Sequence, residues 1–129
     1  MLGSGARMPA IDMEQLKRCH VGETDIRTMR QQVADMRLLA AATDASDTLV
    51  AQLEMQLSER KKQHTQDMAA VISGVNRIRD ELTRQVAWGY YARGKSTLTI
   101  AKEQNYSQEH VRRRLRAAEK LLTGCDGDG

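Results

Sequence analysis

The sequence predicts an all-α protein, in which an N-terminal helical hairpin with a coiled-coil-like pattern precedes a C-terminal tri-helical helix-turn-helix domain. Helix-favouring residues dominate the chain, and its only proline, Pro9, precedes every periodic segment. Aromatic residues make up 3% of the chain, fewer than a β-sandwich or barrel normally uses. Apolar residues also recur at three- and four-residue steps, the spacing of one face of a helix.

The first helix is expected from about Asp12 to Ala42, after a flexible tail at 1–11. Alternating three- and four-residue steps align a narrow apolar stripe made of Ile26, Met29, Val33, Met36 and Ala40. Gly22 weakens a helix by about 1 kcal/mol relative to Ala, so the pattern leaves a break or kink there open.

The second helix follows a turn at 43–47, where Asp44 or Ser46 can serve as the N-cap. Its apolar residues are Leu49, Leu53, Leu57, Met68, Val71, Val75, Ile78 and Leu82. A narrow stripe cannot bury itself, so the two helices must pack on each other, on another chain, or both. Residues 12–76 are therefore interpreted as a helical hairpin and oligomerisation region. A homodimer is predicted, although an intramolecular hairpin would also satisfy both stripes.

Residues 77–123 are predicted to hold three shorter helices. The first, at 83–93, ends at Gly94, which suits the left-handed conformation that follows a helix. Core packing is favoured over base stacking for its aromatic residues, Trp88, Tyr90 and Tyr91. Ser96 is expected to cap a short second helix at 97–104. The residues of that helix expected to point inward are Leu98 and Ala101.

The last helix is expected from Gln108 to Leu122, after a turn at 105–107 in which Ser107 is the N-cap. Its inner face comprises Val111, Leu115, Ala118 and Leu122. Residues 124–129 are expected to form a flexible tail. A short helix, a three-residue turn and a longer helix, with a supporting helix before them, make up the tri-helical helix-turn-helix plan.

Charge is distributed unevenly along the chain, whose net charge is +3. Residues 1–76 carry 9 Lys and Arg against 10 Asp and Glu, a net charge of −1. Residues 77–122 carry 11 against 5, a net charge of +6, and Asp126 and Asp128 give the tail −2. A basic block behind a nearly neutral segment indicates a polyanionic partner for the C-terminal part.

The outer face of the last helix predicts that this partner is double-stranded DNA. Arg reads guanine and Gln can read adenine in the major groove, and the N-terminal residues of a recognition helix reach base edges. The predicted base-reading residues are Ser107, Gln108, Glu109, Arg112 and Arg113. The predicted phosphate-binding residues are Lys95, Lys102, Arg114, Arg116 and Lys120.

An enzyme is not expected, because the chain has no Gly-rich phosphate loop, metal-ligand cluster or nucleophile motif. No cofactor or metal is expected either, and His20 and His64 are expected to be solvated helix residues. Cys19 and Cys125 lack metal or disulfide spacing and are interpreted as reduced thiols. Without a signal peptide or a membrane-spanning stretch, the protein is expected in the cytoplasm.

The segments from Gly94 to Ala101, Tyr106 to Arg113 and Ala117 to Leu121 resemble the fourth conserved region of sigma factors. With a helical N-terminal half, the chain is also similar to the ArpU- and RinA-like late-gene regulators of phages and prophages. The usual apolar residue before the turn is missing at 102–105, so Tyr106 is expected to fill its space.

The resemblance implies sequence-specific binding to promoter-type DNA, transcription regulation and contact with RNA polymerase. The alternative is a helical interaction or structural protein whose hairpin binds a partner. This alternative includes a DNA-packaging small subunit, although such proteins usually place the helix-turn-helix before the oligomerisation helices.

Overall fold

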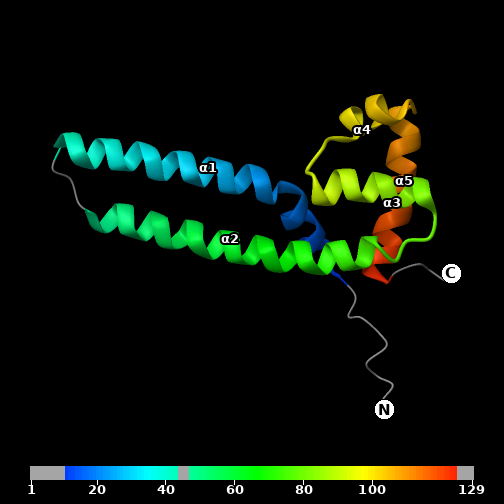
Figure 1. Ribbon diagram of the computed structural model, residues 1–129, viewed down its shortest axis with the longest axis horizontal. Helices are drawn as coiled ribbons and strands as arrows, with labels where there is room; N and C mark the ends of the chain where they lie inside the picture. The colour runs from blue at the N-terminus through cyan, green and yellow to red at the C-terminus, as the bar shows by residue number, and fades with distance from the viewer. Residues whose placement is uncertain (1–10, 44–46, 125–129) are drawn as a thin grey trace, which may run out of the picture.

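The computed structural model describes residues 11–43 and 47–124, and the predicted all-α fold is confirmed for them (Figure 1). The elements are α1 (Met13–Thr43), α2 (Asp47–Val75), α3 (Glu81–Ala87), the π-helical turn η2 (Trp88–Ala92), α4 (Thr97–Gln104) and α5 (Gln108–Thr123). The two candidate N-caps of the second helix, Asp44 and Ser46, lie outside the described residues. No helix in the described ranges is long and apolar enough to cross a membrane.

Helices α1 and α2 form a long antiparallel hairpin that extends away from the cluster of α3, α4 and α5 (Figure 1). Ile26 and Val33, two residues of the predicted stripe, are buried between them. Helix α1 runs continuously through Gly22, so the break left open by the sequence does not occur. A Cβ atom at this position would lie 2.0 Å from His64 Nδ1. The glycine therefore allows α2 to approach α1 closely.

Neither hairpin histidine is solvated, and the prediction for both is wrong. His64 is 9% exposed because its ring lies against the backbone of Gly22. The His20 ring stacks on Tyr90, with ring centroids 3.7 Å apart, and its Nδ1 lies 2.7 Å from the Tyr90 carbonyl oxygen. Contacts between segments far apart in the chain bury His64 and partly bury His20, and helix periodicity does not reveal such contacts.

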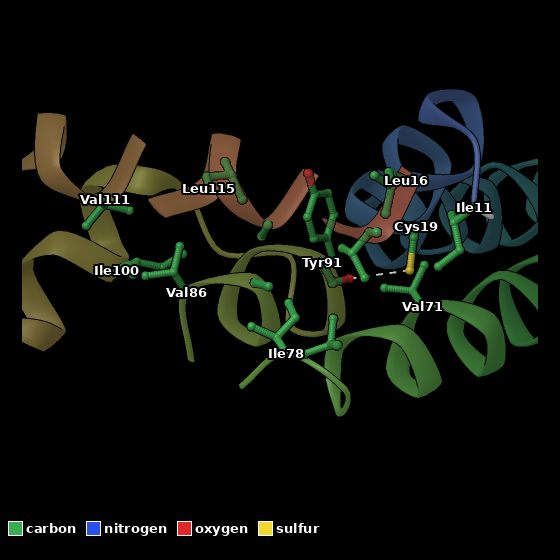
Figure 2. Packing of buried hydrophobic residues seen from close by; sticks show 14 of the residues in the cluster. Ile11, Leu16, Cys19, Val71, Ile78, Val86, Tyr91, Ile100, Val111 and Leu115 are labelled. Atoms are coloured by element: carbon green, nitrogen blue, oxygen red, sulfur yellow. Dashed lines mark hydrogen bonds between the residues drawn. The ribbon is translucent and has the colours of Figure 1, made fainter. Parts of the chain in front are cut away.

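A continuous core joins the base of the hairpin to the C-terminal helices (Figure 2). Leu16, Cys19 and Val71 come from the hairpin, and Tyr91 packs against them from η2. Ile11, predicted to lie in a flexible tail, is buried in this core, and its N–H donates to the Leu122 carbonyl oxygen at 3.2 Å. The prediction for Ile11 is therefore wrong, because a backbone hydrogen bond and apolar burial hold it against α5.

Two buried polar groups in this region form hydrogen bonds within the protein. The Tyr91 hydroxyl donates to Glu119 Oε2 at 3.0 Å, which connects η2 to α5. The Cys19 thiol donates to the Tyr91 carbonyl oxygen at 3.5 Å, drawn as a dashed line in Figure 2. Burial raises the pKa of Cys19 to about 11, so this thiol is protonated and unreactive at neutral pH.

A charged network also stabilises the base of the hairpin. Asp67 on α2 is fully buried, and Arg18 on α1 donates to its two carboxylate oxygens through Nε and Nη2, each at 3.1 Å. Gln63 Nε2 donates to the same carboxylate at 3.1 Å. Burial acts to raise the pKa of Asp67, but the hydrogen bonds from Arg18 and Gln63 outweigh it and lower the pKa. Asp67 is therefore ionised in the folded protein.

The supporting helix before the helix-turn-helix begins earlier than predicted and changes its winding. Asp80 is the N-cap of α3, and its carboxylate accepts from the N–H of Thr83 at 2.9 Å. The sequence predicted one α-helix over 83–93, but residues from Trp88 onward form a π-helical turn in which Arg93 N–H donates to the Trp88 carbonyl oxygen. Such a turn accommodates one extra residue, which an α-helical period cannot indicate.

Candidate nucleic-acid interface

Local caps define the helix–turn–helix unit of α4 and α5. The hydroxyl of Ser96 accepts from the Thr99 N–H at 3.1 Å, and the hydroxyl of Ser107 accepts from the His110 N–H at 3.1 Å. Asn105, at the end of α4, has a positive φ of 60°, which Asn tolerates better than most residues. The predicted caps and turn are therefore confirmed, as is the left-handed conformation of Gly94, whose φ is 67°.

Two side chains of this unit lie differently from prediction. Ile100, and not Leu98, packs inward with Ala101, while Leu98 is 49% exposed, because residues two apart on a helix point to nearly opposite sides. Tyr106 does not fill a core space. Its side chain is exposed, and its ring lies 4.8 Å from the His110 ring on the surface.

Helix α5 is amphipathic, with a buried apolar face and a basic outer face. All four predicted inner residues are buried: Val111, Leu115, Ala118 and Leu122. Helix α5 packs against α3 and α4, where Figure 2 shows Val111 and Leu115, and Leu122 lies against Gly74 of α2. The opposite face carries Arg112 and Arg113, both exposed. Neither guanidinium pairs with any residue in the described part of the chain.

The other three predicted base-reading residues are engaged within the protein. Ser107 caps α5, as described above. Gln108 Nε2 donates to Thr97 Oγ1 at 2.9 Å, which ties the start of α5 to the start of α4. Glu109 is exposed, and its Oε2 lies 3.5 Å from Nη2 of Arg116, which is on the same face of α5 about two turns further along. The exposed arginines, in contrast, are free to meet an external acceptor.

The predicted phosphate-binding residues also divide into paired and unpaired groups. Lys95 pairs with Glu103 at 2.8 Å, and Arg114 lies 3.5 Å from Asp80 Oδ2. The hydrogen bonds from Thr83 lower the pKa of Asp80, and the nearby Arg114 adds to this effect. Lys102 and Lys120 are exposed and have no partner among the described residues.

The internal partners of Gln108, Arg114 and Arg116 were not identified from the sequence. The partners of Gln108 and Arg114 lie on other helices, so no local pattern indicates them. Glu109 and Arg116, however, are seven residues apart on one helix, and this spacing places them on the same face. Helical periodicity was therefore sufficient to find that pair.

A helical hairpin packed on a helix–turn–helix with a basic outer helix is typical of nucleic-acid-binding proteins. Residues 50–127 match the family described as Phage antitermination protein Q, and the chain belongs to this family. Its members are regulators of late phage transcription that bind DNA and RNA polymerase and are not enzymes. No curated protein and no solved structure matches the chain.

The match confirms the predicted phage transcription regulator and corrects its family. The residue pattern resembled ArpU- and RinA-like regulators, whereas the matched family is that of antitermination protein Q. The matched range begins inside α2, so it covers half of the hairpin and the whole helix–turn–helix.

Proposed function

We propose that this protein regulates late phage transcription in the cytoplasm by inserting α5 into the major groove of a specific duplex DNA site. The observation that carries the proposal is the pair of adjacent, exposed arginines on α5, Arg112 and Arg113, which no described residue neutralises. An unpaired guanidinium retains all of its donors for an external acceptor. On a helix that follows a tight turn, that acceptor can be the guanine edge.

The charge distribution supports duplex DNA as the partner. The net charge of +6 is confined to residues 77–122, and the exposed, unpaired Lys102 and Lys120, one on each side of the arginines in the sequence, are available as phosphate ligands. The weak pairs of Arg114 and Arg116, both at 3.5 Å, can exchange their carboxylate for a phosphate at little cost. Within this proposal, Gln108 acts mainly as a positioning residue, because Thr97 already accepts its amide hydrogen bond.

The similarity of residues 94–121 to the fourth region of sigma factors supports the same placement of α5. It also supports contact between this chain and RNA polymerase, in agreement with the properties of the family. We assign duplex recognition to residues 77–123 and partner contacts to the hairpin at 12–76. Since one core spans both parts, the experiments below use the full chain.

Selection of bound sites from random duplex DNA with the full-length protein tests this function directly. We expect enrichment of a defined sequence, and the double variant Arg112→Ala, Arg113→Ala should enrich nothing. Arg30→Ala, which removes an exposed arginine from α1, is the matched control and should select the same site as the unmodified chain. Equal selection by the double variant, folded to the same melting temperature, would show that α5 does not read the DNA.

The tip of the hairpin supports a second part of the proposal, a homodimer. Four of the exposed large apolar side chains lie near this tip: Leu38, Leu39, Leu49 and Met55. Exposed apolar side chains remote from the core can form a contact surface when a second copy covers them. Sedimentation equilibrium should give twice the chain mass of 14.5 kDa, and Leu38→Glu should return it to the monomer. A monomeric unmodified chain at tens of micromolar would contradict the dimer.

A further inference from the structure

A groove of about 410 Å³ lies between α4 and the segment formed by α3 and η2. Its floor includes Gly89 and Ile100, which pack closely enough that a Cβ atom at Gly89 would lie 3.3 Å from the Ile100 side chain. The volume lies within the range of small-molecule sites, roughly 300–1,000 Å³. None of the lining residues comes from α5, so the groove is separate from the proposed DNA-reading surface.

The side chains around this groove differ in whether they are already engaged. Lys95 pairs with Glu103, and Arg84 donates to the Ile78 carbonyl oxygen at 2.9 Å. Trp88 packs against the core, as the sequence predicted, but it is only partly buried, and none of the described residues accepts a hydrogen bond from its indole N–H. The Arg93 guanidinium is likewise without a described partner. The groove thus presents an aromatic ring and an unpaired cation to whatever enters it.

Two amide side chains complete this set of available groups. Asn76 and Gln104 both line the groove, are exposed, and have no side-chain partner within residues 11–43 and 47–124. Amides can donate and accept hydrogen bonds at the same time, as the edges of nucleobases require. An acidic peptide would pair with the cation and, through its backbone, with the amides, but its acidic side chains bring no planar ring to stack on the indole.

We propose that this groove binds one unpaired nucleotide of a single-stranded nucleic acid, with the base on Trp88 and its phosphate on Arg93. Aromatic stacking and a cationic contact to the backbone are the two elements by which proteins hold single strands. Asn76 and Gln104 contact the base edge. The site gives the protein a second nucleic-acid contact that does not depend on the duplex bound by α5.

Trp88 is the only tryptophan of the chain, so its fluorescence reports directly on this groove. Titration of the full-length protein with oligo(dT) or oligo(rU) of equal length should quench the emission saturably, and the strand that binds more tightly identifies DNA or RNA as the source. Arg93→Gln should weaken binding and flatten the dependence of log affinity on log salt by about 0.7, the value for one single-strand contact. The matched control Arg30→Gln should leave both unchanged.

The fluorescence anisotropy of a labelled single strand measures binding by the Trp88 variants. It therefore separates the contribution of base stacking from that of the Arg93 charge. Trp88→Phe should retain binding, whereas Trp88→Leu, which keeps an apolar side chain against the core, should weaken it by about 5- to 150-fold. Arg112→Ala should leave single-strand binding intact although it impairs duplex reading, so the two proposals fail independently. Absence of quenching with both strands would overturn the inference. Equal weakening by Arg93→Gln and Arg30→Gln, or equal quenching by polyglutamate, would also overturn it.

Discussion

Arginine residues at the base of the hairpin and on α5 have opposite environments. Arg18 donates two hydrogen bonds to the buried Asp67, and Arg60 donates to the carboxylate of Asp25 at 3.1 Å. Arg112 and Arg113 have no acceptor in the described part of the chain. An arginine whose charge is neutralised internally stabilises the fold and contributes little to the attraction between the protein and a polyanionic partner. An arginine without such a partner adds nothing to packing and leaves its donors available.

This comparison separates the residues whose loss should destabilise the protein from those whose loss should only impair its function. Composition alone does not make the distinction, because both kinds contribute equally to the net charge. Whether an arginine stabilises the fold or stays available to a partner depends on the distance from its guanidinium to a carboxylate. The substitutions below test it, beginning with the largest expected effect.

Arg18→Met should destabilise the protein by about 3–5 kcal/mol, because it leaves the carboxylate of Asp67 buried without its cation. Asp67→Asn should cost less, about 1–3 kcal/mol, since the Arg18 side chain is 43% exposed and can turn to water. Urea denaturation measures both values, with Arg30→Met as the control on the same helix. Equal stability of Arg18→Met and Arg30→Met would contradict the role given to this pair.

The pair of Arg18 and Asp67 should also make the free energy of unfolding depend on pH in the acidic range. The pKa of Asp67 is lower in the folded protein than in the unfolded chain, where it is about 3.9. Its contribution is therefore complete above that value and is lost as the pH falls through the folded pKa. The unfolding free energy of Asp67→Asn, measured from neutral pH to below pH 4, should decrease less than that of the unmodified chain. Parallel decreases would show that other carboxylates dominate.

Gly22→Ala should destabilise the protein by about 1–3 kcal/mol, because the added methyl group collides with the buried ring of His64. Helix propensity alone predicts the opposite, a gain of about 1 kcal/mol. The double variant Gly22→Ala, His64→Ala should recover most of the lost stability, since removal of the ring makes room for the methyl. Thr24→Ala, at an exposed position of α1, is the control. Stabilisation by Gly22→Ala would show that the helices do not approach this closely.

Much of the fold could be predicted because its signals are local. A serine three residues before the N–H that it caps, as at Ser96 and Ser107, is visible in the sequence. Gly94 marks the end of a helix in the same way. The inner face of α5 follows from periodicity, which places Val111 and Leu115 on one side. These features depend on neighbours within one or two turns of helix.

The features that the sequence did not indicate depend on contacts between distant segments. Arg18 and Asp67 are separated by 49 residues, so no spacing rule connects them. The burial of His64 depends on a glycine of the other helix. In the candidate site, periodicity identified the exposed arginines of α5, but not that Gln108 is held by Thr97 on α4. The engaged and the available side chains differ only in tertiary structure.

Arg112→Ala should relax the preference for the selected duplex site over random DNA by about 1–3 kcal/mol, because one bidentate contact to a base is lost. Its melting temperature should be unchanged, since the side chain is exposed and unpaired. Competition binding against both duplexes measures the preference, and Arg113→Ala is tested in parallel. If both variants keep the preference of the unmodified chain, α5 does not enter the groove, and recognition belongs to another surface.

Arg116→Ala should have the smallest effect and a different character. Arg116 lies one turn beyond Arg112, where a recognition helix leaves the groove and approaches the phosphates. Its pair with Glu109 is long, at 3.5 Å, and the Arg116 side chain is 58% exposed, so a phosphate can displace the carboxylate. Affinity for specific and random duplexes should fall equally, and the slope of log affinity against log salt should flatten by about 0.9, one phosphate contact. Lys120→Ala, which removes an unpaired cation of the same helix, should flatten the slope similarly. A loss of preference in Arg116→Ala would mean that α5 lies deeper in the groove than proposed, with Arg116 rather than Arg112 at the base edge.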